Sequence, residues 1–299
     1  MDKFVSVIIP VLNDIVGLRQ TLTALNNQTY PTHLYEVIVV DNGSTEDLSP
    51  VVSQFTQAKL TQESQPGSYI ARNQGISIAQ GEILAFTDSD CLPESNWIAQ
   101  GVQQLLLVNN CGLVAGKINF YYQKHQQPTI VELYDSTTFL NQKKYVEQLH
   151  YAATANMFTT KAVMQRVGNF NAELKSGGDK EWGQRVYHHG YLLVYGADVC
   201  ISHPARASLS EIARKINRTR TGGQDLDLLS ADNKLKLYQK RLSKILWRLK
   251  PPSKSMVAKL NSCADSINWL QKIQLLGITI GLHYYGIWGD ITRLFVQKK

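Results

Sequence analysis

Short apolar runs alternate with helical periodicity over the first ninety residues of this chain. Runs at 5–11, 35–40 and 83–86 are typical of strands buried on both faces of a sheet. Between them, residues 17–26 carry leucines on one face of a predicted helix, and residues 68–80 predict a second helix. The alternation of strand and helix predicts a parallel, doubly wound α/β sheet.

Polar residues follow each of these runs. Asn13 follows the first, Asp41 follows the second, and Asp88, Ser89 and Asp90 follow the third. The carboxyl ends of parallel strands meet at one edge of the sheet, where open α/β folds bind their ligands. A single aspartate at a strand end is usually a helix cap, but three consecutive strands ending in Asn or Asp predict a pocket.

Asp88 and Asp90 stand two residues apart at the end of a buried strand. Such a pair can offer hard oxygen ligands to Mg2+ or Mn2+ and leave other coordination positions to phosphate oxygens and water. An isolated pair of this kind is more often a polar turn. An EF-hand is excluded because the required Gly and Glu are missing, and no GxGxxG motif follows the first strand to indicate a dinucleotide site.

Four segments together resemble a known family. SVIIPVLND, VIVVDNGS, GSYIARNQGI and GEILAFTDSDC stand in the order and spacing of the inverting family 2 glycosyltransferases, and the resemblance extends from Val5 to about Gly223. It implies a GT-A fold, which is an α/β fold with a mostly parallel sheet flanked by helices. It also implies a nucleotide-sugar donor and a divalent metal cofactor, Mn2+ or Mg2+.

The same resemblance implies which residues bind the donor. It places Asp41 at the base, Arg72 near the base and phosphates, and Asp88 at the ribose. The guanidinium of Arg72 would suit a diphosphate on its own chemistry, although an ion pair with Asp41 or Asp88 is the alternative. The implied nucleotide-sugar-binding residues in this half are Pro10, Val11, Asn13, Asp41, Arg72, Asp88 and Ser89.

The segment SGGDKEWGQR is expected to contain the catalytic base. In the family an acidic pair opens the acceptor-side helix, and its aspartate removes the proton of the acceptor hydroxyl. Here Gly178 and Asp179 replace the usual Glu-Asp, so the resemblance assigns the base to Asp179, with Glu181 as the second choice. The alternative role for Asp179 is that of a helix N-cap, which a catalytic carboxylate can also fill.

His203 lies in CISHPAR, after a predicted strand at 192–201. A histidine at this point commonly completes the metal shell in GT-A enzymes, and a neutral imidazole suits Mn2+. The resemblance therefore implies Asp90 and His203 as metal ligands, whereas an isolated histidine near a proline is most often structural. Three basic residues follow that could clamp a donor diphosphate or a phosphorylated lipid acceptor, or simply form a solvated face: Arg206, Lys215 and Arg218.

Composition and charge separate the tail from the rest of the chain. The 299 residues are 43% hydrophobic and 18% charged, as in a folded protein, and the four scattered cysteines form no zinc or disulfide pattern. The net charge of +7 is concentrated in residues 232–259, which hold nine Lys/Arg and one Asp. The apolar run at 4–12 is too short to span a bilayer and is expected to be the first strand, not a signal segment.

Two stretches of the tail have an apolar face. Apolar residues from Leu235 to Leu249 recur at helical spacing among lysines and arginines, which predicts a basic amphipathic helix. Residues 273–288 carry no formal charge but fall short of the ~20 residues of a spanning helix. We interpret the pair as an anchor on an anionic membrane surface, with a helical cap on the catalytic domain or a homodimer contact as alternatives. The basic segment matches no nucleic-acid recognition module.

With the family resemblance, the sequence thus predicts a metal-dependent inverting glycosyltransferase that uses a nucleotide-diphosphate sugar, with UDP as the expected nucleotide. The acceptor would be a hydroxyl of a saccharide or lipid-linked molecule in polysaccharide or glycolipid assembly, at the cytoplasmic face of the cell membrane. We expect a catalytic domain at 1–225, with a donor half at 1–115 and an acceptor half at 116–225, and a helical tail at 226–299. The alternatives are a sugar-nucleotidyltransferase and a non-catalytic module that binds nucleotide-sugar or membrane; the sugar, the acceptor and the oligomeric state stay open.

Overall fold

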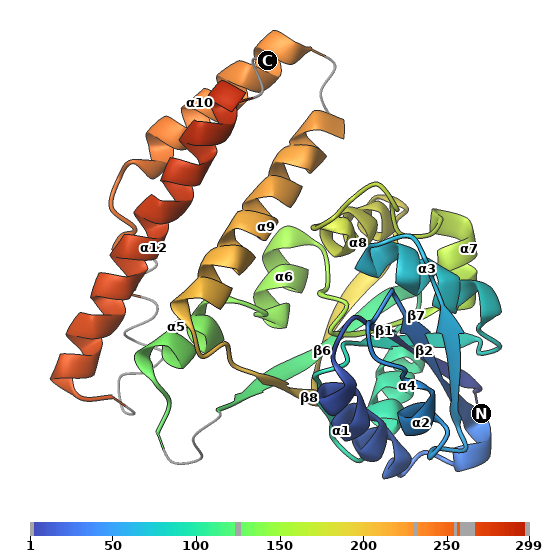
Figure 1. Ribbon diagram of the computed structural model, residues 1–299. Coiled ribbons are helices and arrows are strands. Elements are labelled where there is room, and N and C mark those ends of the chain that lie inside the picture. The colour runs from blue at the N-terminus through green and yellow to red at the C-terminus, as the bar shows by residue number, and fades with distance from the viewer. Residues whose placement is uncertain (1–2, 123–126, 230–232, 254–255, 258–266, 297–299) are drawn as a thin grey trace. The chain divides into compact units, whose positions relative to one another are not determined.

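The computed structural model describes residues 3–122, 127–229, 233–253, 256–257 and 267–296 (Figure 1). The chain divides into two compact units. The first comprises Met1–Phe120 and Leu140–Pro204, and the second comprises Tyr121–Phe139 and Ala205–Lys299. Each unit is described below by itself.

The first unit is built on an eight-stranded sheet with the order β3-β2-β1-β4-β7-β6-β8-β5. Its strands are β1 (Val5–Val11), β2 (Tyr35–Asp41), β3 (Ala58–Gln62), β4 (Ile83–Thr87), β5 (Leu92–Pro93), β6 (Cys111–Tyr121), β7 (Asn156–Thr160) and β8 (Leu192–Pro204). Its helices are α1 (Ile15–Asn26), η1 (Thr32–Leu34), α2 (Ser49–Val52), α3 (Ser68–Ile78), α4 (Trp97–Leu107), α6 (Gln142–Leu149), α7 (Lys161–Val167) and α8 (Gly178–His188).

The predicted α/β fold class is confirmed. β1 pairs in parallel with both β2 and β4, as the three apolar runs predict, and β2 pairs in parallel with β3. β7 then pairs antiparallel with β4 and with β6, so the sheet as a whole is mixed. β3 has no counterpart in the sequence predictions, because the half-exposed sequence AKLTQ lacks a continuous apolar run.

Side chains of successive residues on β1 point to opposite faces of the sheet. Helices cover both faces (Figure 1). Val7 and Ile9 belong to the same buried cluster as Leu18 of α1. On the opposite face, a Cβ added at Gly75 of α3 would lie 2.6 Å from the side chain of Ile8. The sheet is therefore dry on both faces, and its strand ends are where polar groups can gather.

The second unit is helical. Its described helices are α5 (Ile130–Thr138), α9 (Leu209–Leu229), α10 (Lys234–Arg248) and α12 (Trp269–Val296), and Leu133, Ile212 and Leu275 are among the residues of its core. The predicted boundary at residue 225 falls inside α9, because Gly222 and Gly223 do not interrupt that helix. The separation of a catalytic domain from a tail, and of donor and acceptor halves, stays a prediction.

The two predicted apolar stretches of the tail lie on α10 and α12. α12 has 28 residues and contains the whole uncharged stretch at 273–288. Within the described part of the chain, no helix combines the length and apolar character needed to cross a membrane. Two lysines of the predicted basic segment, Lys254 and Lys259, lie outside the described residues, and so does one of the four cysteines, Cys263.

Candidate active site

The polar strand ends meet at one edge of the first unit's sheet. Val11 at the end of β1 is paired with Asp41 at the end of β2, and β4 ends at Thr87, directly before Asp88. Pro10 and Val11 are the last residues of β1, and the Val11 side chain is buried in the core. The sheet itself therefore assembles the predicted donor residues of three strands.

Four side chains near the end of β4 converge closely enough to bind a metal ion. One ligand atom each from Asp88, Asp90, Cys91 and His203 lies within 4.8 Å of the others. His203 comes from the end of β8, and its Nε2 lies 3.8 Å from Oδ2 of Asp90. Its Nδ1 lies 2.7 Å from the carbonyl oxygen of Pro204, which can only accept a hydrogen bond, so a neutral imidazole that donates from Nδ1 would present the Nε2 lone pair to the aspartates.

The electrostatics of this cluster suit a cation. Burial raises the pKa of Asp90, the positive charge of a protonated His203 would lower it, and the nearby carboxylates of Asp88 and Asp14 raise it further. Burial also raises the pKa of the Cys91 thiol, which is fully enclosed. A divalent ion with oxygen and imidazole ligands fits this donor set and would offset the repulsion among the carboxylates.

Arg72 of α3 pairs with Asp88. Its NH2 group lies 2.5 Å from Oδ1 of Asp88, and the residue is only 3% exposed. Its Nε is buried and makes no hydrogen bond to any described residue, and its guanidinium lies 5.8 Å from the ring centre of Tyr69. Of the two ion pairs considered from the sequence, the structure thus forms the one with Asp88.

Asp14, the N-cap of α1, and Thr21 within that helix hold the loop of residues 88–91, and sequence reasoning missed both. Asp14 caps α1 by accepting a hydrogen bond from Gly17 N, and its other oxygen accepts one from the hydroxyl of Ser89 at 2.8 Å. The hydroxyl of Thr21 contacts the carbonyl oxygens of Ser89 and Cys91, each at 2.7 Å. The signal for Asp14 was its place directly after Asn13 at a strand end, whereas Thr21 on a helix gave none.

Asn13 and Asp41 are joined through the loop that follows β2. Oδ1 of Asp41 accepts a hydrogen bond from Ser44 N at 2.8 Å, and the hydroxyl of Ser44 accepts one from Asn13 N at 3.0 Å. The side-chain oxygen of Asn13 in turn accepts a bond from Thr45 N. Asn13 has a φ of 54°, a left-handed conformation that Asn tolerates better than most residues. Both predicted residues therefore shape the loop between the ends of β1 and β2.

Asp179 lies in the first turn of α8 and contacts Tyr69 of α3. The Tyr69 hydroxyl donates to Oδ1 of Asp179 at 3.1 Å, and Lys180 N donates to the same oxygen. Burial raises the pKa of Tyr69, and the carboxylate of Asp179 raises it further, so the phenol stays protonated and donating. Gly178 packs closely against Tyr69, since a Cβ added at Gly178 would lie 2.8 Å from the tyrosine ring.

The alternative base, Glu181, is occupied by another contact. Its two carboxylate oxygens lie 2.6 and 3.1 Å from the guanidinium nitrogens of Arg185, one turn later on α8. Arg185 also donates to the carbonyl oxygens of Val167 and Asn169. This network ties α8 to the preceding loop, which is a structural role for Glu181.

Arg206 belongs to the second unit and has a buried partner there. Its guanidinium lies 3.1 Å from Oδ1 of Asp135 on α5, and its backbone nitrogen donates to Oδ2 of the same carboxylate. Asp135 is completely buried. The predicted diphosphate contact of Arg206 would therefore have to share the guanidinium with this ion pair.

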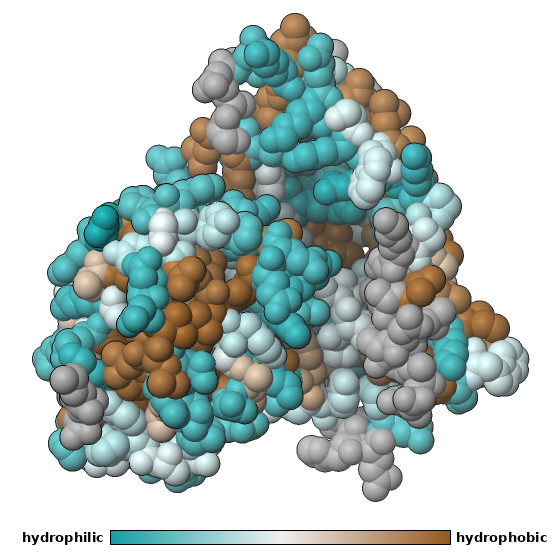
Figure 2. Space-filling view, turned by 180° about the vertical axis from the view of Figure 1, so that it is seen from behind, coloured by the Kyte–Doolittle hydropathy of each residue, from teal (hydrophilic) through white to brown (hydrophobic). Residues whose placement is uncertain are grey.

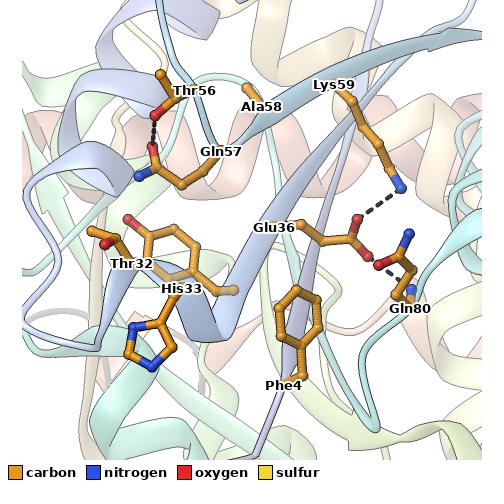
Figure 3. Close-up of a pocket in the computed structure, with 10 residues that line it drawn as sticks. Phe4, Thr32, His33, Glu36, Thr56, Gln57, Ala58, Lys59 and Gln80 are labelled. Carbon is orange, nitrogen blue, oxygen red and sulfur yellow. Dashed lines mark hydrogen bonds and ion pairs between the residues drawn. The ribbon is translucent and has the colours of Figure 1, made fainter.

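A pocket of about 480 Å3 lies at the opposite ends of the strands and contains none of the predicted site residues (Figure 3). Its polar centre is Glu36, to which Lys59 and Gln80 point. Lys59 Nζ lies 2.7 Å from the carboxylate, and Ser6 and Gln80 also donate to it. Burial raises the pKa of Glu36, but these hydrogen bonds together lower it below its usual value. We attribute a structural role to this group.

Comparison with known proteins agrees with the geometry of the strand ends. Residues 6–168 match the family model described as glycosyl transferase family 2. The chain is 40% identical over 224 residues to the glycosyltransferase AglE of Haloferax volcanii, an alignment that covers 73% of this chain and 72% of that protein. It is 30% identical over 226 residues to the pre-mycofactocin glycosyltransferase of Mycobacterium tuberculosis, covering 71% of this chain and 45% of that protein.

A solved structure has the same fold. The mannosyltransferase PcManGT of Pyrobaculum calidifontis, determined in complex with GDP-Man and Mn2+, superimposes with a TM-score of 0.66 at 18% sequence identity. The superposition covers the whole of this chain and 89% of that one. At this identity the likeness shows the fold alone, and it agrees with the predicted GT-A architecture.

Proposed function

Because the chain belongs to glycosyl transferase family 2, we propose that it is a metal-dependent inverting glycosyltransferase that uses a nucleotide-diphosphate sugar, with UDP as the nucleotide. One observation carries the proposal. Contacts run from Asp88 through Arg72 and Tyr69 to Asp179, so the candidate donor group and the candidate base belong to one continuous site. The family membership also disfavours the sugar-nucleotidyltransferase alternative.

On the proposed donor side, Asp90 and His203 would hold Mn2+ or Mg2+, and Asp88, expected at the ribose, lies beside them. When bound, the ion would supply Lewis-acid stabilisation of the leaving nucleoside diphosphate. Arg72 adds a fixed positive charge beside the carboxylates, and its buried Nε is a donor still available for a phosphate oxygen. The fold neighbour with bound GDP-Man and Mn2+ supports this arrangement for a protein of the same architecture.

On the acceptor side we propose Asp179 as the general base. The acceptor oxygen forms a bond to the anomeric carbon while the bond to the diphosphate breaks and its electron pair leaves with the nucleotide. The hydroxyl proton passes to the Asp179 carboxylate, and the anomeric centre is inverted in the single displacement. Tyr69 orients this carboxylate through the bond to Oδ1, whereas Glu181 is retained by Arg185.

The donor and the base are tested together by release of nucleotide from a panel of UDP- and GDP-sugars with Mn2+. We expect slow hydrolysis of one donor, lost in Asp90→Ala and reduced by about 10²-fold or more in Asp179→Asn. Glu181→Gln is the matched control, since it removes the same charge from the same helix, and it should lose less than about tenfold. Activity that persists in Asp179→Asn but falls in Glu181→Gln would overturn the assignment of the base.

If no donor is hydrolysed, calorimetry with UDP and Mn2+ decides between the remaining readings. Binding that requires Asp90 would indicate a competent donor site whose acceptor is missing from the assay. No binding of any nucleotide diphosphate would refute the proposed donor chemistry and favour a module that acts only through its surfaces.

We further propose that the helical tail lies on an anionic membrane surface, where the enzyme would meet a saccharide or lipid-linked acceptor. α10 and α12 expose large apolar side chains, and Figure 2 shows brown hydrophobic side chains beside hydrophilic ones on the helices in its upper part. The exposed set includes Leu235, Tyr238, Leu242, Trp247, Trp269, Ile273, Tyr284, Tyr285 and Trp288. Co-sedimentation with phosphatidylglycerol vesicles, but not with phosphatidylcholine vesicles, is the expected result; a dimer in solution without vesicle binding would favour the homodimer alternative.

A further inference from the structure

Three arginines of the second unit converge on one buried carboxylate. Asp290 of α12 is 3% exposed, and both of its oxygens accept hydrogen bonds from guanidinium groups. Arg220 of α9 and Arg248 of α10 contact Oδ2, the latter at 3.0 Å. Arg293, one turn further along α12, lies 3.2 Å from Oδ1. We call these three arginines with Asp290 the arginine cluster.

Glycine on α12 makes this convergence possible. Gly286 stands one turn before Asp290, and a Cβ added there would lie 2.4 Å from Nε of Arg220. The Arg220 side chain therefore crosses α12 through the space that a larger residue would fill. Gln224 of α9 donates to Oδ1 of Asp290 at 3.1 Å, so the carboxylate already accepts four hydrogen bonds. Little acceptor capacity is left on Asp290 for the remaining guanidinium N–H groups.

The cluster carries more positive charge than its carboxylate neutralises. Three guanidinium groups share one carboxylate, and each guanidinium has five N–H donors in a fixed geometry. Nε of Arg293 is buried and makes no hydrogen bond to any described residue. Burial lowers the pKa of Arg220, the Asp290 carboxylate raises it, and the charges of Arg248 and Arg293 lower it further. The mutual repulsion of three guanidinium groups around one carboxylate destabilises the unit unless a second anion binds among them.

The arginines of the cluster are partly exposed to solvent. The side chains of Arg248 and Arg293 are 38% and 25% exposed, whereas that of Asp290 is 4% exposed. An incoming anion could therefore reach exposed parts of these two arginines, whereas the carboxylate is buried. A phosphate group matches both the excess charge and the planar, two-pronged hydrogen bonding of arginine.

We propose that the arginine cluster of α9, α10 and α12 is a binding site for a phosphate group, either on a lipid headgroup or on a soluble phosphate. The site is independent of the glycosyl transfer proposed for the first unit, and it uses none of the residues assigned there. It also differs from general attraction to an anionic surface, because the donors are preorganised around one point.

Inorganic phosphate is the first probe, and the full-length protein is titrated with it by calorimetry at constant ionic strength. Arg248→Gln is the test variant, and Lys244→Gln is its matched control on the same helix, since Lys244 pairs with Asp227 outside the cluster. We expect Arg248→Gln to weaken phosphate binding by about tenfold or more and Lys244→Gln to change it by less than about twofold. Equal effects of the two variants would reduce the proposal to non-specific charge attraction and overturn it.

Asp290→Asn provides a second variant whose effect has the opposite sign. Removing the competing carboxylate should strengthen phosphate binding, whereas a purely structural salt-bridge network would only become less stable. Phosphate should then raise the thermal midpoint of Asp290→Asn by more than it raises that of the wild type. No phosphate binding by either protein would refute the site, whatever the outcome of the donor-hydrolysis assay.

Vesicles identify the source of the phosphate. Phosphatidic acid presents a phosphomonoester, and phosphatidylglycerol at matched surface charge presents only a diester. Preferential sedimentation with phosphatidic acid that Arg248→Gln abolishes would identify a lipid headgroup. Binding of inorganic phosphate without any preference between the vesicles would identify a soluble phosphate instead.

Discussion

Asp88 and Asp90 stand two residues apart, yet their replacement by asparagine should affect stability in opposite ways. The Arg72 side chain is 4% exposed, and Asp88 is its partner at 2.5 Å. Asp88→Asn therefore leaves a buried guanidinium with a weaker acceptor and no counter-charge. The pKa of Asp90 is instead raised, chiefly by burial. A charged His203 lowers this pKa, and the carboxylates of Asp88 and Asp14 raise it. Neutralising it relieves repulsion in the metal-free protein.

The magnitudes follow from exposure. Breaking a fully buried ion pair costs roughly 3–5 kcal/mol. The Asp88 side chain is 37% exposed, and asparagine keeps one acceptor oxygen, so we expect Asp88→Asn to cost about 2 kcal/mol after allowance for solvent screening. The Asp90 side chain is 40% exposed, and solvent screens the repulsion it meets, so Asp90→Asn should raise the free energy of unfolding by less than about 1 kcal/mol.

Urea unfolding of the metal-free protein measures both variants, with hydrogen exchange on peptides from β1 and β4 to report on the first unit alone. Mn2+ titration of the same samples should show weaker binding in Asp90→Asn, although that variant is at least as stable as the wild type. If Asp88→Asn is as stable as the wild type, the ion pair between Arg72 and Asp88 does not stabilise the fold. If Asp90→Asn loses more than about 1 kcal/mol of unfolding free energy, the Asp90 carboxylate is not repelled by its neighbours.

Three further predictions concern other parts of the first and second units. Tyr69→Phe should lower kcat of donor hydrolysis by about tenfold with little change in KM, because it removes the hydrogen bond that orients Asp179; an equal rise in KM would instead indicate a binding role. Gly101→Ala should cost about 1–3 kcal/mol, since its Cβ would lie 2.3 Å from a buried ring, whereas Gly223→Ala has open space and should stabilise by up to about 1 kcal/mol in thermal unfolding. The pKa of Glu36 is lower in the folded protein than in the unfolded chain, so the ionised carboxylate stabilises the fold above the unfolded-state pKa, and this stabilisation is lost as the pH falls through the folded-state pKa. Glu36→Gln should therefore lower the free energy of unfolding by about 2 kcal/mol at pH 7. If this difference from the wild type does not shrink below about pH 4, the assigned direction of the pKa shift is wrong.

Three of the parallel strands, β1, β2 and β4, could be predicted because each has a recognisable local sequence pattern. The runs that became β1, β2 and β4 are apolar on both faces, and burial on both faces is what a central parallel strand requires. β3 escaped prediction because an edge strand is half exposed and need not be apolar. The antiparallel pairing of β7 with β4 could not be foreseen, since nothing in a short strand encodes its direction relative to a distant one.

The sequence indicated which residues gather at the candidate site, and their roles stay predictions; it did not indicate how their charges pair. Polar residues at strand ends and the spacing of Asp88 and Asp90 pointed to the sheet edge. The family resemblance implied His203, which stands 113 residues after Asp90, and the structure brings it into the same group of possible ligands. Which carboxylate Arg72 would contact stayed open, because a long flexible side chain can reach any of several acceptors. The hydrogen bond between Tyr69 and Asp179 joins residues 110 positions apart and left no sign in the local pattern.

The sequence by itself determined where the apolar strands β1, β2 and β4 form and which residue types stand at their ends, because burial periodicity and residue type are local properties of the chain. Only the tertiary structure decided the partners of the charges. In the folded protein Asp88 pairs with Arg72, Glu181 pairs with Arg185, and Asp290 pairs with three arginines from separate helices. Charge pairing depends on distances across the fold, and those distances exist only once the sheet and the helices have packed.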